Sequence, residues 1–169
     1  VQCAAMPQTR VANNDTPLLS GEVTSWVRMM ELNVSGQLFS VRAAWPLLTS
    51  GPESRIVFFS SEAGWSFSPG FGPYNVAKAA LNSLGASLAA EAANAYPMQD
   101  IQINILDPGE ARTEMNQGSQ RSPYTTVAMA VALLSHPTGG PNGKFFHSDG
   151  RHLSFAKSRP YPVDLLNVS

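Results

Sequence analysis

Cysteine is almost absent from this chain of 169 residues, which has only Cys3. A single cysteine excludes an internal disulfide framework and fits a reducing compartment, so we expect a cytoplasmic location. The chain also has little excess charge, because 11 Lys and Arg nearly balance 12 Asp and Glu, leaving a formal net charge of −1. There is no basic stripe, so we expect no nucleic-acid partner. No apolar run approaches the ~18 residues of a membrane span, so no membrane partner is expected either.

Metal-binding side chains are few and scattered as well. The histidines His136, His147 and His152 lack the spacing of a metal site, and Cys3 lies far from them in the sequence. We therefore expect no bound metal. What the chain does have is a large apolar share, 43% of its residues. This is enough for one ordinary domain over residues 1–169, with a mixed tail at 153–169.

Strand and helix patterns alternate along the chain. Apolar residues recur at every third or fourth position from Trp26 to Leu48, which indicates a long helix, and Ser20 is placed to cap it near Glu22. The run RIVFFSS at 55–61 is continuously apolar at first, as in a strand buried on both faces. The expected elements are a strand at 1–5, a helix at 22–48, a strand at 55–61, a helix at 73–95, a strand at 101–109, a helix at 125–135 and a strand at 143–150.

This alternation predicts an α/β fold, with a parallel sheet that helices cover on both faces. In such sheets, ligands bind beyond the carboxyl ends of the strands. Polar residues stand at two of these ends, namely Ser60 and Ser61 after the second strand and the segment 107–113 after the third. A simpler explanation is open for Asp107, which could bond the backbone of the Pro-Gly turn that follows it.

A tyrosine and a lysine four residues apart, Tyr74 and Lys78, open the helix expected at 73–95. On a helix this spacing places both side chains on one face, one turn apart. A free phenol has a pKa of about 10, too high for a base near neutrality. A close ammonium lowers that pKa by roughly 1–3 units and makes the pair an acid–base catalyst for an alcohol or carbonyl. The alternative is that Tyr74 only packs and Lys78 is solvated.

Four polar residues and the segments around them resemble the short-chain dehydrogenase/reductase family. Ser61 lies 13 residues before Tyr74, and Asn33 lies 28 residues before Ser61. The similar segments are ELNVSG (31–36), IVFFSSEAG (56–64), YNVAKAAL (74–81), DPGEARTEM (107–115) and GKFFHSDGR (143–151), with a weaker likeness at VQCAAM (1–6). The resemblance covers roughly residues 1–152 and implies a Rossmann-like three-layer αβα fold.

The resemblance implies catalytic roles for Asn33, Ser61, Tyr74 and Lys78. Tyr74 would exchange a proton with the substrate oxygen, and Ser61 would hydrogen-bond that oxygen. Lys78 would lower the pKa of Tyr74 and hold the nicotinamide ribose, while Asn33 would hold a water of a proton relay behind Lys78. Taken singly, Asn33 could instead cap a helix bend, and Ser61 could satisfy a strand end.

The resemblance also implies NAD or NADP as the cofactor. The residues implied to contact it, besides Tyr74 and Lys78, are Ala4, Ala5, Pro108, Gly109, Ala111 and Thr113. The Pro108-Gly109 turn would let backbone approach the nicotinamide, and Thr113 would bond its carboxamide or the pyrophosphate. Thr113 could otherwise cap a following helix.

One family feature is not found in these residues, namely the Gly-rich turn that cradles the dinucleotide pyrophosphate. No G-x-x-x-G-x-G occurs in the 169 residues, so the chain resembles the fold without its first strands. Three interpretations stay open. The chain could be the catalytic portion of an NAD(P)-dependent oxidoreductase for an alcohol or carbonyl substrate, a non-catalytic relative that serves as a scaffold or interaction subunit, or a small-molecule binding module.

Two further expectations concern the substrate and the assembly. Trp65, Phe67 and Phe71 could form an apolar substrate wall or could be ordinary packing. The helices at 22–48 and 73–95 carry more apolar surface than one sheet face can cover, and in the related family they form a dimer interface. We therefore expect a homo-oligomer, or a pairing with a chain that supplies the N-terminal half.

Overall fold

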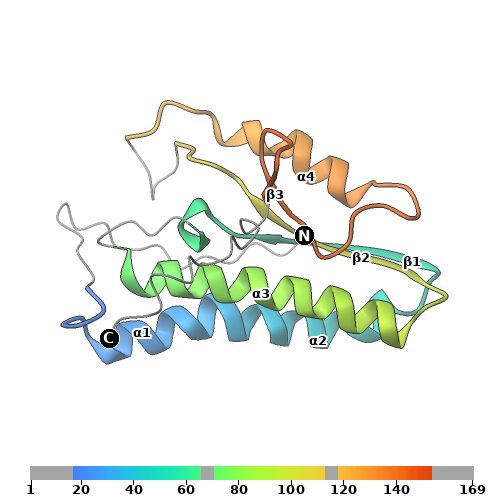
Figure 1. The fold of residues 1–169 in the computed structure, drawn as a ribbon, viewed down its shortest axis with the longest axis horizontal. Coiled ribbons are helices and arrows are strands. Elements are labelled where there is room, and N and C mark those ends of the chain that lie inside the picture. Colours follow the sequence, from blue (N-terminus) through green and yellow to red (C-terminus); the bar gives the residue numbers. More distant parts are fainter. Residues whose placement is uncertain (1–16, 66–70, 113–117, 154–169) are drawn as a thin grey trace, which may run out of the picture.

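The computed structural model describes residues 17–65, 71–112 and 118–153. They form a mixed α/β fold with a central sheet of four strands in the order β1-β2-β3-β4, shown edge-on in Figure 1. Strands β1 (Glu53–Phe59), β2 (Asp100–Asp107) and β3 (Phe145–His147) run parallel, and β4 (His152–Leu153) is antiparallel to β3. The expected parallel sheet is confirmed, while β4 was not predicted, because a two-residue strand has no period to read.

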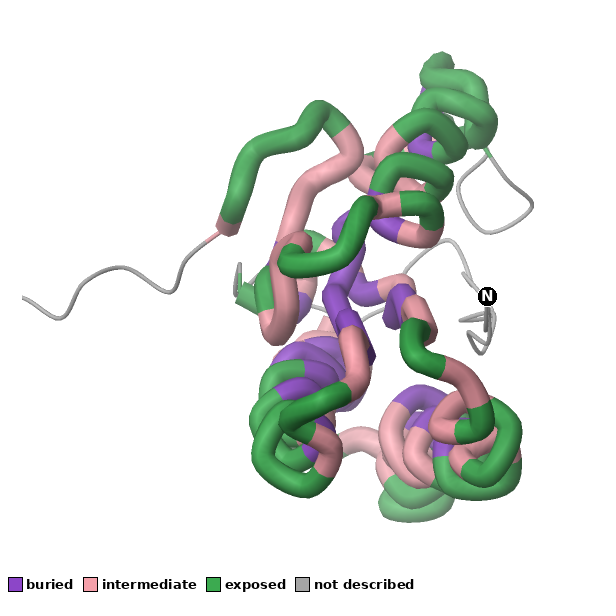
Figure 2. Tube along the Cα trace, turned by 90° about the vertical axis from the view of Figure 1, so that its right-hand side faces the viewer, coloured by how far each residue is buried: buried purple, intermediate pink, exposed green. Residues whose placement is uncertain are grey.

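Helices cover the sheet on both sides and complete three layers (Figure 1). On one face lie α1 (Val23–Met30), α2 (Gly36–Leu48) and α3 (Gly72–Ala95), and on the other lies α4 (Val127–Leu134). The end-on view in Figure 2 shows the buried strands between these two helical layers. The predicted helices are confirmed within a few residues, except that the single helix expected at 22–48 is interrupted.

The interruption is a π-helical turn at Glu31–Ser35, which separates α1 from α2. A π-turn adds a residue to the helical repeat and is frequently found at functional sites. The expectation that Ser20 caps this helix is wrong, because the N-cap is Glu22 and no side chain bonds the free N–H groups there. The strand expected at 1–5 and the tail at 153–169 lie outside the described residues, apart from Leu153.

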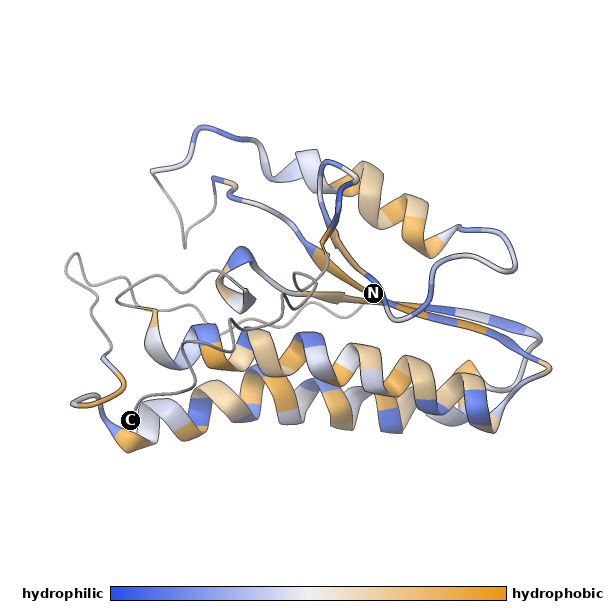
Figure 3. Cartoon of the chain, in the orientation of Figure 1, coloured by the Kyte–Doolittle hydropathy of each residue, from blue (hydrophilic) through white to orange (hydrophobic). Residues whose placement is uncertain are grey.

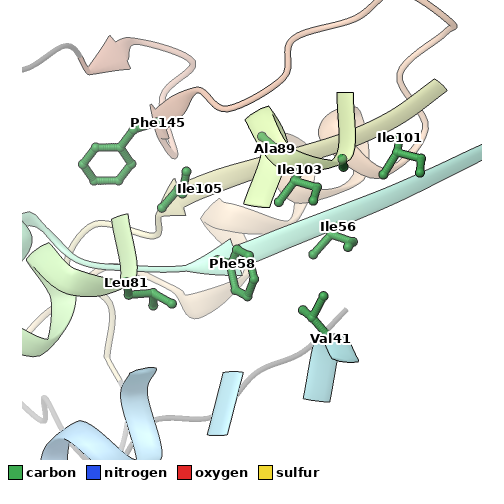
Figure 4. Close-up of a cluster of buried hydrophobic side chains, with 10 residues drawn as sticks. Val41, Ile56, Phe58, Leu81, Ala89, Ile101, Ile103, Ile105 and Phe145 are labelled. Atoms are coloured by element: carbon green, nitrogen blue, oxygen red, sulfur yellow. The ribbon is translucent and has the colours of Figure 1, made fainter. Parts of the chain in front are cut away.

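Successive residues of a strand point to opposite faces, and the two central strands supply a core on each side. Ile103 and Phe58 are both fully buried and pack toward α2 and α3, as Figure 4 shows. Val57 and Leu106 point the other way and pack with Leu133 of α4, whose ribbon is mostly coloured hydrophobic in Figure 3. The uninterrupted apolar run of β1 is therefore explained by burial on both faces.

Close contact between α3 and β2 requires glycine at position 85. A Cβ on Gly85 would lie 2.8 Å from Cγ1 of Ile105 and 3.2 Å from Cδ2 of Phe58. Because no side chain intervenes, the helix backbone rests directly on the strand. This contact fixes the distance of α3 from the carboxyl ends of β1 and β2, where the polar residues predicted from the sequence are found.

Candidate active site

Tyr74 and Lys78 lie in the first turns of α3, which begins at Gly72 with Pro73 in its first turn. Lys78 is only 2% exposed, and its Nζ donates a hydrogen bond to the carbonyl oxygen of Phe59 at 3.0 Å. The same Nζ lies 5.5 Å from the centre of the Tyr74 ring. Because Lys78 is buried, the alternative that its side chain is solvated is wrong. Such burial is unusual, since lysine is among the side chains least often fully buried.

Ser61 is brought to Tyr74 by the short turn that follows β1. It caps the 3-10 turn Glu62–Gly64, where its Oγ accepts from the Ala63 N–H at 3.2 Å. The Ser61 side chain is also hydrogen-bonded to the Tyr74 hydroxyl. Tyr74 and Ser61 therefore present two hydroxyls side by side, as the resemblance implied.

The position of that turn depends on Gly64, which packs against α3. A Cβ on Gly64 would lie 2.7 Å from Nδ2 of Asn82 and 3.0 Å from the carbonyl carbon of Lys78. Both are closer than ordinary contacts allow, so only glycine lets the turn lie this close to the helix. The hydrogen bond between Ser61 and Tyr74 rests on this approach.

Asn33 is fully buried in the π-turn, which packs against α3. Its Nδ2 donates to the backbone oxygen of Met29 at 3.1 Å and lies 3.2 Å from the sulfur of the same residue. Its Oδ1 is buried and accepts no hydrogen bond from the described residues. Buried polar atoms are normally paired, so this oxygen is suited to hold a water or a ligand group.

The pKa of Tyr74 is raised above its ordinary value, mainly because burial disfavours the phenolate. The hydrogen bond from Ser61 acts in the opposite direction, and the negative charge of Asp107 raises the pKa further. The net lowering of this pKa that we expected from Lys78 is not found, because burial of the phenol is the largest effect on it. Nζ of Lys78 lies 5.5 Å from the centre of the ring and donates to the Phe59 carbonyl oxygen.

The Pro108-Gly109 turn stands at the carboxyl end of β2, next to the segment that carries Ser61. Gly109 has a φ of +67°, a conformation that favours glycine. Its N–H donates to Oδ1 of Asp107 at 2.9 Å, so the backbone role considered for Asp107 is confirmed for one carboxylate oxygen. Pro108 and Ala111 are half-buried beside it. Ala4, Ala5 and Thr113 lie outside the described residues, so their implied cofactor contacts stay predictions.

One buried polar side chain near the site was not singled out from the sequence. Asn82 is 3% exposed, and neither atom of its amide has a partner among the described residues. Asn82 follows Tyr74 and Lys78 at four-residue spacing, so the three side chains lie along one face of α3. This regular four-residue spacing of polar side chains was the signal available in the sequence.

The remaining candidates from the sequence are aromatic residues near the site and possible metal ligands. Phe71 lies beside Tyr74 with 6.4 Å between the ring centres, and Trp65 is 43% exposed, whereas Phe67 is outside the described residues. His147 pairs with Asp149, with 2.8 Å between Nδ1 and Oδ1. In the part of the chain that the structure describes, no three His, Cys, Asp or Glu side chains gather as metal ligands would.

Comparison with known proteins identifies the family. A family model described as short chain dehydrogenase matches residues 1–123. The chain belongs to the short-chain dehydrogenase family. The Tyr74, Lys78 and Ser61 arrangement lies within the matched residues.

None of the described helices is long and apolar enough to cross a membrane.

Several relatives of known sequence share parts of this chain. The inactive 2-(S)-hydroxypropyl-CoM dehydrogenase 2 of Xanthobacter autotrophicus is 36% identical over 119 residues, which cover 70% of this chain and 50% of that protein. Dehydrogenase/reductase SDR family member 4 of Bos taurus is 34% identical over 69% of this chain and 40% of its own length. The human protein of that name is 35% identical over 54% of this chain and 32% of its own length. The chain thus spans between 32% and 50% of the length of these relatives.

Solved structures confirm the fold. A short chain dehydrogenase of Pseudomonas syringae has a TM-score of 0.72 and 26% identity, over 79% of this chain and 56% of that one. A short chain dehydrogenase of Shigella flexneri in complex with NADP has a TM-score of 0.69 and 22% identity, over 79% of this chain and 57% of that one. The architecture is therefore the Rossmann-like fold of this family, as the sequence implied.

Proposed function

We propose that this chain is the catalytic portion of an NAD(P)-dependent dehydrogenase/reductase that interconverts an alcohol and a carbonyl. The observation that supports this most directly is the hydrogen bond between the hydroxyls of Tyr74 and Ser61, with the buried Lys78 one turn further along α3. No packing requirement explains these three polar groups together. The family and the dehydrogenase/reductase class of its members agree with the proposal.

In this proposal Tyr74 moves the proton. A phenol is protonated near neutrality even at its ordinary pKa of about 10, and burial of Tyr74 raises this pKa further, so the group can donate a proton to a carbonyl oxygen. Ser61 hydrogen-bonds the same substrate oxygen and so orients it against the Tyr74 hydroxyl. The buried Lys78 ammonium stabilises negative charge that develops on the phenol oxygen as the proton leaves.

The residues around the site fit a nicotinamide cofactor. The Pro108-Gly109 turn follows the carboxyl end of β2, and the buried Asn33 Oδ1 and Asp107 Oδ2 have no partners among the described residues. We assign the ribose to Tyr74 and Lys78, and the nicotinamide to the Pro108-Gly109 turn. In the family likeness Ala111, Thr113, Ala4 and Ala5 complete the contacts. When bound, the cofactor supplies the hydride acceptor or donor, and NAD and NADP both remain within the proposal.

A second candidate function is a non-catalytic family member that serves as a scaffold or interaction subunit. It is favoured by one finding, that a relative 36% identical to this chain carries the name of an inactive dehydrogenase. Such a protein would bind its partners without needing the hydroxyl of Tyr74. The two functions therefore differ in a single measurable property.

The experiment compares Tyr74→Phe with the native protein as expressed from its natural gene. We expect turnover of alcohol or carbonyl substrates to fall by roughly 10²-fold or more, because general acid–base groups contribute 10²–10⁴-fold. Binding of NAD or NADP, followed by titration, should be largely retained because only a hydroxyl is removed. The control is Tyr124→Phe, which alters a tyrosine that is 79% exposed. A native protein without turnover would favour the scaffold, and a Tyr74→Phe protein that keeps more than about a tenth of the native rate would rule out the role assigned to Tyr74.

Assembly and location belong to the same proposal. We propose a homo-oligomer, or a complex with a chain that supplies the N-terminal half, because large apolar side chains such as Phe39 and Leu47 are 63% and 77% exposed on α2. A cytoplasmic location is proposed on the single cysteine of the chain.

A further inference from the structure

The carboxyl group of Asp107, at the end of β2, is only half accounted for by the fold. The residue is 2% exposed. Its Oδ1 accepts the Gly109 N–H at 2.9 Å, but its Oδ2 is buried and accepts no hydrogen bond from the described residues. None of the ion pairs among those residues includes Asp107. Among the described residues, this buried carboxylate oxygen therefore has no hydrogen-bond partner.

Asp100, at the opposite end of the same strand, has hydrogen-bond partners for its carboxylate oxygens. Oδ2 of Asp100 lies 2.6 Å from an Arg55 guanidinium nitrogen and accepts from Gln102 at 2.9 Å. Both oxygens of Asp100 are engaged, since Oδ1 accepts the Gly139 N–H at 3.3 Å. The orphan oxygen of Asp107 is therefore not a general property of strand ends in this fold.

The turn at Gly109 does not by itself call for an acid at position 107. An asparagine would offer the same Oδ1 acceptor to the Gly109 N–H without burying a charge. Burying an unpaired carboxylate is costly, so the second oxygen needs another explanation.

Oδ2 of Asp107 is near the reacting groups. β1 and β2 are parallel and in register, with Phe59 opposite Leu106, and the Ser60 N–H donates to the Leu106 oxygen at 2.8 Å. Asp107 thus stands across from the serine segment whose Ser61 bonds Tyr74. The charge of Asp107 also raises the pKa of the Tyr74 hydroxyl, in agreement with this proximity.

We propose that Oδ2 of Asp107 is a specificity-determining acceptor that selects ligands with an N–H donor next to the reacting carbon. A carboxylate bonds an ammonium N–H more strongly than a neutral hydroxyl, because both partners are then ionised, so a cationic N–H group is its preferred partner. The donor that we infer is the ammonium group of an amino alcohol or amino ketone substrate. The inference rests on the proposed function for the identity of the site.

The test measures binding rather than turnover. Because the Gly109 N–H is bonded to the same carboxylate, its amide NMR signal reports on ligands at Asp107. The probes are isopropanolamine, propylene glycol and isopropanol, which share a secondary alcohol and differ in the donor, and nicotinamide, which carries the carboxamide. We expect the Gly109 signal to titrate with isopropanolamine at least tenfold more tightly than with isopropanol. A response to nicotinamide alone would overturn the proposal, because it would show only cofactor binding at the turn.

Two carboxylate variants test the role of the charge. Asp107→Asn should weaken the preferred probe at least tenfold, whereas Glu110→Gln removes the same charge from an exposed neighbour and should leave binding unchanged. Asp107→Asn should melt no lower than the native protein, because the Gly109 bond is kept and the orphan charge is gone. Tyr74→Phe should retain the preference for the N–H probe, which separates this inference from the proposed reaction.

Equal responses to all probes would overturn the proposal, as would no response up to the solubility limit of each probe. The first comparison needs no variant, so it stands even if Asp107→Asn does not fold. An unchanged affinity in Asp107→Asn would likewise overturn it, and Oδ2 would then hold only a buried water.

Discussion

Burial of the Tyr74 hydroxyl determines how its proton is held. Desolvation raises the pKa of Tyr74, the Ser61 hydrogen bond partly offsets this, and the Asp107 charge adds to it. An unfolded chain gives the same phenol a pKa of about 10. The folded protein therefore binds the Tyr74 proton more tightly than the unfolded chain does. The associated stability is present below about pH 10 and is lost as the pH rises through the folded-state pKa.

This gives a prediction for alkaline conditions. The free energy of unfolding of the native protein should fall faster above about pH 10 than that of Tyr74→Phe, by up to ~1.4 kcal/mol per pH unit. Denaturant titrations at a series of pH values measure the difference. Tyr124→Phe, which alters an exposed tyrosine, is the control and should follow the native curve. Parallel curves for the native protein and Tyr74→Phe would show that the pKa of Tyr74 is not raised by folding.

At the scale of the element, the turn Glu62–Gly64 connects β1 to the catalytic face of α3. We expect Gly64→Ala to destabilise the protein by about 1–3 kcal/mol, the usual range for overpacking. A new Cβ would lie 3.0 Å and 3.1 Å from the carbonyl carbon and oxygen of Lys78, which are backbone atoms that cannot easily move.

The same variant should reduce catalysis by more than its stability loss explains, because the displaced turn carries Ser61 away from Tyr74. Denaturant unfolding and turnover are measured on the same preparation. Gly51→Ala is the matched control, since its Cβ would meet nothing closer than an oxygen of Glu53 at 4.0 Å. If Gly64→Ala behaved like Gly51→Ala, the close approach of the turn would not position Ser61.

Elements with strong patterns could be predicted from the sequence, and those set by tertiary contacts could not. Phe58 and Ile103 belong to apolar runs that are typical of strands buried on both faces. The predicted bounds of β1 and β2 therefore lie within two residues of the observed ones. The π-turn around Asn33 was missed because nothing in the local pattern differs from an α-helix.

The candidate site shows the same division. The resemblance to the short-chain dehydrogenase/reductase family was enough to expect Ser61, Tyr74 and Lys78 together, whereas spacing alone related only Tyr74 to Lys78. The direction of the Tyr74 pKa shift was wrong, since it depends on how deeply the ring is buried and on the Asp107 charge. The sequence shows that Lys78 lies one helical turn from Tyr74. It does not show how deeply the Tyr74 ring is buried, and this burial raises the pKa.

At the scale of the molecule, the two helical layers differ in what they leave uncovered. The layer of α1, α2 and α3 exposes Val23 (73%), Phe39 (63%) and Leu47 (77%), and its ribbons in Figure 3 mix hydrophobic and hydrophilic colours. The outer face of α3 carries small exposed residues instead, including Ser83 and Ala86. Large apolar side chains on α2 and small ones on α3 are complementary, as a symmetric contact between two copies requires.

Phe39→Asp tests this assembly. Burying a phenylalanine contributes about 1.5–3 kcal/mol, so its loss should weaken self-association at least tenfold and shift the protein toward the monomer in light scattering at micromolar concentration. Folding should change little, because the side chain is 63% exposed in the single chain. The control is Val131→Asp, at a side chain 54% exposed on α4 in the opposite layer, which should associate as the native protein does. A native protein that is already monomeric would exclude the interface, and dissociation by Val131→Asp alone would move it to the α4 face.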